Sequence, residues 1–367
     1  MRRSGSLVAA ALLLFVAASG LYPVSVDASP PLSATSSTLI DDFIIVDVAA
    51  SPDYATDSTV FALGRDVTGG CGPCPVLFKS TDKAVTWTRL AATDLPLYGR
   101  LTLAPGWPTD NRLYVTSGVG LHASTDGGAS FRTVSVQGVT SSISPQFSAG
   151  DERILLGYPR AWVYDAALDV TLPYEKIIPS ATYIHDLAFA PDHATSGKVF
   201  VGGSTTVGLP SNHMRSTVFL CGSGPVCSTQ LIMANQFAQQ PAFRFSEDFA
   251  TNGLMYVWNV TDLYQSTDGG LTYTTLTPPG GLGDLVLDSD DDIYAVVGGA
   301  TSGAIMKSSD GGATWSNISS GTTFGPRPQF IRVLPDGRLL ATFDIPAFGI
   351  GGVQCSLDDG ATWTNGC

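Results

Sequence analysis

Apolar residues along this chain occur in short runs that alternate with polar positions. Runs at 43–48, 75–78, 113–116 and 218–220 are rich in β-branched and aromatic residues. Gly, Pro, Asp and Ser separate the runs, and alternation bounded by such residues is typical of β-strands joined by tight turns. No segment shows the spacing of an amphipathic helix. The pattern predicts an all-β chain with almost no helix after residue 30.

One turn segment, with the pattern Ser-x-Asp-x-Gly-x-Thr/Ser-aromatic, occurs five times. Its aspartates are Asp82, Asp126, Asp268, Asp310 and Asp358. Ser and Asp side chains bind the N–H groups of their own turn, and glycine supplies a positive φ. The first copy departs from the pattern, because Ala84 stands where glycine is expected. These residue types indicate a structural turn between the third and fourth strands of a repeat, with no catalytic role.

A second recurring segment precedes these turns. Its copies begin at Ser51, Ala104, Ala190 and Ser246. Each copy joins an apolar strand to a β-branched and aromatic strand, as a hairpin loop does.

The spacing of the turns counts the repeats. Neighbouring copies lie roughly 45 residues apart, which is typical of propeller blades. The gap from Asp126 to Asp268 spans about three such periods, so two degenerate repeats must fill it. Strands within 154–164 supply one, and the Ala190 copy with 218–220 supplies the other. The sequence therefore predicts seven four-stranded antiparallel blades in a single domain at 43–367.

The repeated turn resembles the Asp-box, or BNR repeat, of sialidases, sortilin-type receptors, xyloglucanases and photosystem II assembly factors. Five copies make this resemblance specific, and it implies a β-propeller. It also invites a hydrolase function. Sialidases carry an arginine triad and an Arg-Ile-Pro or Arg-Leu-Pro signature in their first blade, which 43–52 lacks. The segment 330–335 contains only a loose echo around Arg332, in the wrong repeat.

No sialidase residue is therefore carried over, and the catalytic residues stay unknown. Xyloglucanases of this type place two aspartates between two propellers, and a single propeller does not form that cleft. A hydrolase would still need two carboxylates roughly 5–9.5 Å apart. We expect no metal site, because the four histidines lack zinc-type spacing and 288–292 lacks the glycine and distal glutamate of a calcium loop.

The N-terminal residues favour an exported protein. Arg2 and Arg3 precede an apolar run at 7–18, which is typical of a signal peptide and short for a membrane span. We expect a signal peptide at 1–28 and an N-terminal extension at 29–42. The net charge of −13 argues against nucleic-acid and membrane-surface partners. No membrane span and a secreted or extracytoplasmic monomer are expected.

Six cysteines in an exported chain indicate disulfides. Local pairing is the simplest arrangement and gives Cys71–Cys74, Cys221–Cys227 and Cys355–Cys367. Cys221 and Cys227 replace the turn motif of their repeat. The string from Cys71 to Cys74 copies the thioredoxin tetrapeptide, but an apolar run at 75–78 indicates a strand where thioredoxin has a helix, so a structural clip is favoured.

Alignment of the first strands predicts the mouth of a central channel. One residue per blade falls at that level, namely Asp47, Arg100, Pro145, Asp186, Ala242, Asp284 and Phe330. Tyr183 and His185 lie beside Asp186. Three carboxylates with one guanidinium would raise a carboxyl pKa or attract a cation, although Arg100 could instead neutralise Asp47 or Asp186. A water-filled polar channel without a ligand is the simpler alternative.

The sequence therefore favours a secreted, non-catalytic propeller that binds a glycan, peptide or protein. The alternative is an extracytoplasmic glycoside hydrolase. No cofactor is predicted apart from the cation that the channel mouth could hold.

Overall fold

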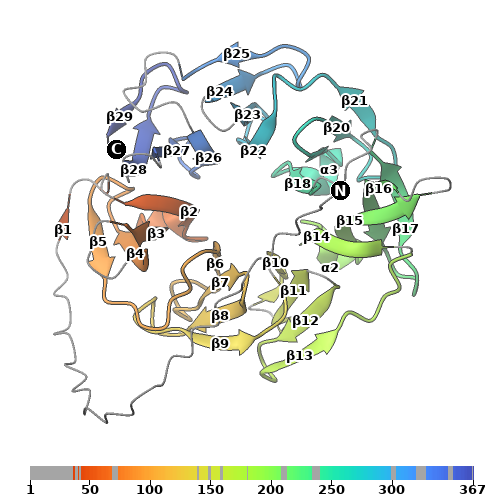
Figure 1. Cartoon of the computed structure of the whole chain (residues 1–367), viewed down its shortest axis with the longest axis horizontal. Helices are drawn as coiled ribbons and strands as arrows, with labels where there is room; N and C mark the ends of the chain where they lie inside the picture. The colour runs from red at the N-terminus through yellow and green to blue at the C-terminus, as the bar shows by residue number, and fades with distance from the viewer. Residues whose placement is uncertain are drawn as a thin grey trace, which may run out of the picture. The chain divides into compact units, whose positions relative to one another are not determined.

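The computed structural model describes residues 36–37, 40, 43–67, 73–138, 140–147, 150–157, 160–179, 181–207, 213–233, 240–298, 303–319, 328–345, 350–365 and 367. The predicted signal peptide at 1–28 lies outside these residues. Ser33–Cys367 forms one compact unit. Within it, seven antiparallel sheets follow one another around a ring (Figure 1).

Each blade has its strands in chain order from the centre outward. Blades 1 to 4 contain β2 (Ile44–Ala50), β3 (Val60–Asp66), β4 (Cys74–Ser80), β5 (Trp87–Leu90); β6 (Arg100–Leu103), β7 (Leu113–Ser117), β8 (Gly120–Ser124), β9 (Arg132–Ser135); β10 (Thr140–Ile143), β11 (Arg153–Gly157), β12 (Trp162–Asp165), β13 (Val170–Pro173); and β14 (Ala181–Phe189), β15 (Val199–Val207), β16 (His213–Cys221), β17 (Ser228–Ile232).

Blades 5 to 7 contain β18 (Ala242–Phe245), β19 (Met255–Trp258), β20 (Leu263–Ser266), β21 (Thr274–Leu276); β22 (Leu282–Leu287), β23 (Ile293–Gly298), β24 (Gly303–Ser308), β25 (Ser316–Asn317); and β26 (Pro328–Val333), β27 (Leu339–Ile345), β28 (Ile350–Ser356), β29 (Thr364–Asn365). The predicted seven-bladed propeller is confirmed. A short strand, β1 (Ser36–Ser37), adds a fifth strand beside β5 at the outer edge of blade 1.

The loop between the first and second strands differs from the expected plain hairpin. In blades 1, 4 and 5 it contains one helical turn, which is α1 (Tyr54–Asp57), α2 (His193–Ser196) and α3 (Phe249–Asn252). In blade 1, Ser51 Oγ accepts the N–H of Asp53 and donates to Asp57, and Asp57 in turn accepts the N–H of Thr59. These side-chain bonds close the loop on itself and favour the helical turn.

The core lies between the blades. Seven buried clusters each combine apolar residues of two adjacent blades, so every blade interface has one. One of them packs Val60 and Trp87 of blade 1 against Phe330 and Leu340 of blade 7. Side-chain packing thus joins the last blade to the first, as expected for repeats that cannot bury their faces alone.

Two of the predicted disulfides are present. Cys221–Cys227 closes the turn between β16 and β17, with the Cα atoms 4.2 Å apart. Cys355–Cys367 has its Cα atoms 5.3 Å apart, so the C-terminal tail folds back toward β28. Cys71 lies outside the described residues, and its bond to Cys74 remains a prediction.

Candidate functional site

Three innermost strands carry an aspartate at the same level of the ring. Asp47 on β2, Asp186 on β14 and Asp284 on β22 each lie where the register with the second strand shifts by one residue. Such a β-bulge re-aims the side chain and bends the strand. The shared position places these three carboxyl groups at corresponding places in blades 1, 4 and 6.

Each of these carboxyl groups binds the backbone of the following blade. Asp47 Oδ2 accepts the N–H of Leu101 on β6 at 2.8 Å. Asp284 Oδ2 accepts the N–H of Ile331 on β26 at 3.3 Å, and Asp186 accepts a backbone N–H from blade 5 in the same way. The aspartates therefore connect the innermost strands of neighbouring blades.

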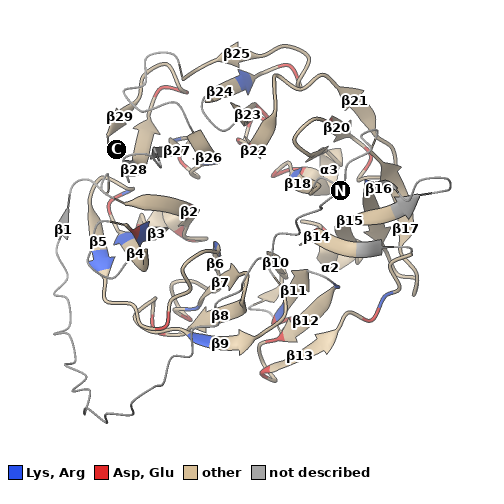
Figure 2. Ribbon diagram, viewed as in Figure 1, with Lys and Arg blue, Asp and Glu red and all other residues tan. Residues whose placement is uncertain are grey.

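Two partly buried guanidinium groups pair with these acids. Arg332 on β26 donates from Nη2 to Asp47 at 2.8 Å and from Nη1 to Asp284 at 2.6 Å. Arg244 on β18 donates from Nη2 to the other oxygen of Asp284 at 3.2 Å. The Arg332 side chain is 23% exposed and that of Asp47 only 6%, so this pairing is largely shielded from water. Figure 2 shows acidic and basic residues together on the innermost strands.

We call this group the axial cluster. Its members are Asp47, Arg100, Asp186, Arg244, Asp284 and Arg332. Within it the environments of Asp186 and Asp284 differ. Burial raises the pKa of Asp186, and the guanidinium groups of Arg100 and Arg244 only partly offset this effect. Burial also acts on Asp284, but its guanidinium neighbours outweigh it and hold the Asp284 pKa below its ordinary value.

The remaining predicted site residues are Arg100 on β6, and Tyr183 and His185, which are close to Asp186 in sequence on β14. Arg100 is exposed and forms no direct ion pair among the described residues. His185 Nε2 contacts Ser204 Oγ at 2.5 Å, and burial lowers the His185 pKa. Tyr183 is 39% exposed, with its ring centroid 6.4 Å from that of His185. Of these groups, the Arg100 guanidinium and the Tyr183 phenol are exposed to solvent.

The axial cluster differs from the predicted one in its charge. The sequence interpretation counted three carboxylates against Arg100 alone, whereas Arg244 and Arg332 also belong to the group and balance it. Pro145 is not at the predicted level. It lies in the turn after β10, and Thr140, on that strand, takes the corresponding position.

A signal for the two missed arginines exists in the sequence. Arg244 and Arg332 each lie two residues after the aligned position of their blade, at Ala242 and Phe330. Residues two apart on a strand point to the same side of the sheet. An alignment that also compared the positions two residues further along each first strand would have found these two arginines.

All five Asp-box aspartates lie in turns between the third and fourth strands of their blades. In the box of blade 6, Asp310 Oδ1 accepts the Ser308 hydroxyl at 2.8 Å and the N–H of Thr314 at 2.8 Å, and Oδ2 accepts the Thr314 hydroxyl. These bonds, led by that from the Thr314 side chain, lower the pKa of Asp310 to about 2. The carboxyl group of each Asp box is thus hydrogen-bonded within its own turn.

Among the described residues, no group of three or more His, Cys, Asp or Glu side chains is placed to hold a metal ion. The cation at the channel mouth remains a prediction, and the excess of negative charge that motivated it is absent from the axial cluster. No helix in the described part of the chain is long and apolar enough to span a membrane.

No family model and no curated protein matches this chain. Among solved structures, the extracellular domain of BT4673 from B. thetaiotaomicron has 12% identity and a TM-score of 0.56 over 86% of this chain and 38% of that chain. This chain therefore spans well under half of the length of that solved chain. YCF48 bound to D1 peptide has 14% identity and a TM-score of 0.53 over 88% of this chain and 95% of that chain. These likenesses confirm the predicted resemblance to Asp-box propellers at the level of the fold.

Proposed function

We propose that this chain is a secreted binding module that holds a glycan, peptide or protein ligand and does not catalyse a reaction. This proposal rests on the way in which the carboxyl groups of the axial cluster are bonded. Asp47 and Asp284 are committed to Arg332 and to backbone N–H groups. Carboxylates held in this way serve as structural links, and they are poorly placed to act as a nucleophile or to activate water.

The exposed side of the axial cluster supports ligand binding there. Arg100 on β6 is exposed and free of a direct ion pair among the described residues, and Tyr183 on β14 is also exposed. A guanidinium and a phenol bind carboxylate, amide or hydroxyl oxygens of a ligand. YCF48 was solved with a D1 peptide, which is compatible with a peptide as one class of ligand for this fold.

An extracytoplasmic location fits the same proposal. The two observed disulfides persist in oxidising compartments. The apolar segment at 7–18 is typical of a signal peptide, and one structural neighbour is an extracellular domain.

The test is binding of the purified protein to glycan and peptide arrays, followed by titration of the strongest ligand. Arg100→Ala and Asp186→Ala should each weaken binding about tenfold, the loss of roughly one good hydrogen bond. Arg132→Ala, which removes an exposed ion pair between blades 2 and 3, is the matched control and should bind normally. Binding that is unchanged in both axial variants would contradict the proposal.

One observation favours the alternative of a glycoside hydrolase. Asp186 has a raised pKa and Asp284 a lowered one, and such opposed shifts are what an acid and a base require. Release of reducing sugar from a polysaccharide panel, abolished by Asp186→Asn, would establish the hydrolase and overturn the binding proposal. We expect no release.

A further inference from the structure

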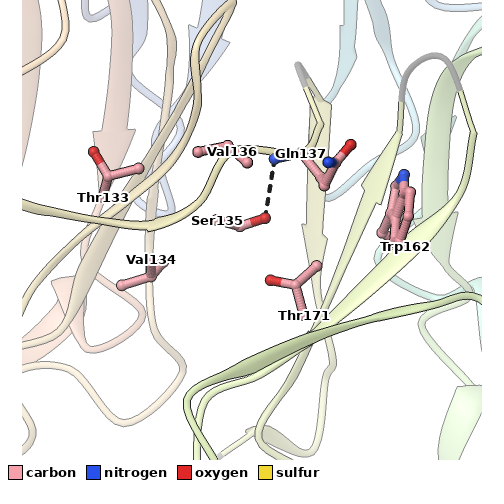
Figure 3. Close-up of a pocket in the computed structure, with 7 residues that line it drawn as sticks. All are labelled: Thr133, Val134, Ser135, Val136, Gln137, Trp162 and Thr171. Atoms are coloured by element: carbon pink, nitrogen blue, oxygen red, sulfur yellow. Dashed lines mark hydrogen bonds between the residues drawn. The ribbon is translucent and has the colours of Figure 1, made fainter.

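A pocket lies between the outer parts of blades 2 and 3. It has a volume of about 370 Å³, within the range of small-molecule sites. One side consists of Thr133, Val134, Ser135, Val136 and Gln137, from β9 and the segment after it, and the other of Trp162 on β12 and Thr171 on β13 (Figure 3). The axial cluster, in contrast, lies on the innermost strands.

The lining of this pocket is uncharged. It contains hydroxyl groups, one primary amide, one indole and two valines. Val136 is 76% exposed and offers apolar surface at the rim. In a chain with a net charge of −13, a pocket without a single ionised side chain suits a neutral ligand and gives no counterion to a phosphate or a carboxylate.

Two buried polar atoms in the lining have no partner among the described residues. They are Nε1 of Trp162 and Oγ1 of Thr171. Trp315 and Trp363 differ, because their Nε1 atoms donate to Gly312 and Ile318 oxygens at 3.2 and 2.8 Å. A buried donor without an acceptor costs free energy, so such groups are rare unless something else binds them.

The other polar groups of the pocket are held in place. Ser135 Oγ accepts the N–H of Gln137 at 3.1 Å, the bond drawn in Figure 3. Thr133 Oγ1 contacts His122 Nδ1 at 3.3 Å. Part of the Trp162 side chain packs against the buried cluster between blades 2 and 3. In Figure 3 the Thr171 hydroxyl is turned toward the side of the pocket formed by Val134 and Ser135. The two unpartnered atoms therefore lie among groups that are largely fixed by contacts within the protein.

We propose that this pocket binds a neutral sugar. The Trp162 indole N–H donates to a sugar oxygen, and the Thr171 hydroxyl exchanges hydrogen bonds with a sugar hydroxyl. The indole ring and Val136 contact the apolar C–H face of the ring. The site does not depend on the axial cluster, so each proposal can fail without the other.

The test is a titration of the full chain, with ¹⁵N-labelled tryptophan, with glucose, galactose, mannose, N-acetylglucosamine and their β-linked disaccharides. The indole N–H resonance of Trp162, assigned with Trp162→Phe, should shift and saturate. Those of Trp315 and Trp363 should stay, because their N–H groups are already bonded. No saturable shift of the Trp162 resonance with any of these sugars would overturn the proposal.

Thr171→Val separates binding from folding. It keeps the shape of the side chain and removes a hydroxyl that has no partner among the described residues, so the thermal midpoint should not fall while sugar affinity drops about tenfold. Gln137→Ala provides a second variant if Thr171→Val does not fold. Unchanged affinity in the variant tested, or an equal Trp162 shift with glucuronate or with a neutral tripeptide, would refute a site for neutral sugars.

Discussion

Replacing Gly270 with alanine measures how strongly stability depends on the close approach between neighbouring blades. Gly270 is the second glycine of the Asp box in blade 5, with φ +82°. A Cβ there would overlap Cε1 of Phe200 in blade 4 and lie 2.8 Å from its Cζ. Phe200 is fully buried, and the rings of Phe243 and Phe249 lie 6.2 Å from it. The phenyl ring therefore has little room to move away.

The expected cost has two parts. A left-handed φ costs an L-residue about 1–2 kcal/mol, and overpacking a tight core costs about 1–3 kcal/mol. Gly270→Ala should therefore lower the free energy of unfolding by about 2–5 kcal/mol. Gly337→Ala is the matched control, because Gly337 has the same φ of +82° and no atom within 4 Å of an added Cβ. It should cost only about 1–2 kcal/mol.

The assay is guanidinium chloride unfolding followed by circular dichroism, with both variants and the original protein at one protein concentration. Similar slopes against denaturant would show that the variants unfold over the same surface. The difference between the two variants then isolates the contact with Phe200. If Gly270→Ala costs no more than Gly337→Ala, the inter-blade contact is soft and this reasoning is wrong.

Three further perturbations address the ion pairs, the disulfide and the Asp boxes. Arg332→Ala should lower the free energy of unfolding by about 3–5 kcal/mol, because it leaves two buried carboxylates short of a partner. Arg132→Ala removes an exposed ion pair and should lower it by at most about 1 kcal/mol. Equal shifts of the denaturant midpoint in the two variants would contradict this. Replacing both Cys221 and Cys227 by alanine opens a short loop, with a sequence separation of 6, and should lower the free energy of urea unfolding by about 2 kcal/mol; unchanged stability would count against a structural role. The folded pKa of Asp310, about 2, lies below its unfolded value, so its stabilisation is complete above pH 4 and is lost as the pH falls through about 2. The thermal midpoint of Asp310→Asn should accordingly change less than that of the original protein between pH 5 and 2.5, and parallel curves would refute the assignment.

Local sequence was sufficient to predict most of the fold. The hydrogen bonds of the Asp box lie within a single turn, as those among Ser308, Asp310 and Thr314 show. Its residue pattern can therefore be recognised without knowing which other segments pack against it. The alternation of apolar and polar positions in the strands and the spacing of the repeats can likewise be recognised without knowing the tertiary contacts. The helical turn in the loop after Ser51 was not predicted. The residues that form its side-chain hydrogen bonds are also typical of a plain hairpin loop, so the sequence pattern does not distinguish the two.

The Asp-box glycine shows where local reasoning is incomplete. Its positive φ was predicted from the motif, but its contact with the previous blade was not. Gly128 would place a Cβ 2.7 Å from Leu77, and Gly360 would place one 2.9 Å from Cβ of Ile318. The glycine is thus needed both for its backbone conformation and for the fit between sheets, and only the packed ring shows the second requirement.

The axial cluster was predicted in part. The repeat alignment placed Asp47, Asp186 and Asp284 at one level, because equivalent positions in equivalent blades share a radius and a height. Their partners could not be derived in this way. Arg332 pairs with Asp47 across a sequence separation of 285 residues and with Asp284 across 48. The sequence alone placed Asp47, Asp186 and Asp284 at equivalent positions of their blades, whereas ring closure decided which charges meet. Hydrogen bonds and ion pairs act over a few ångströms, and only the closed ring brings groups so far apart in the chain within that distance.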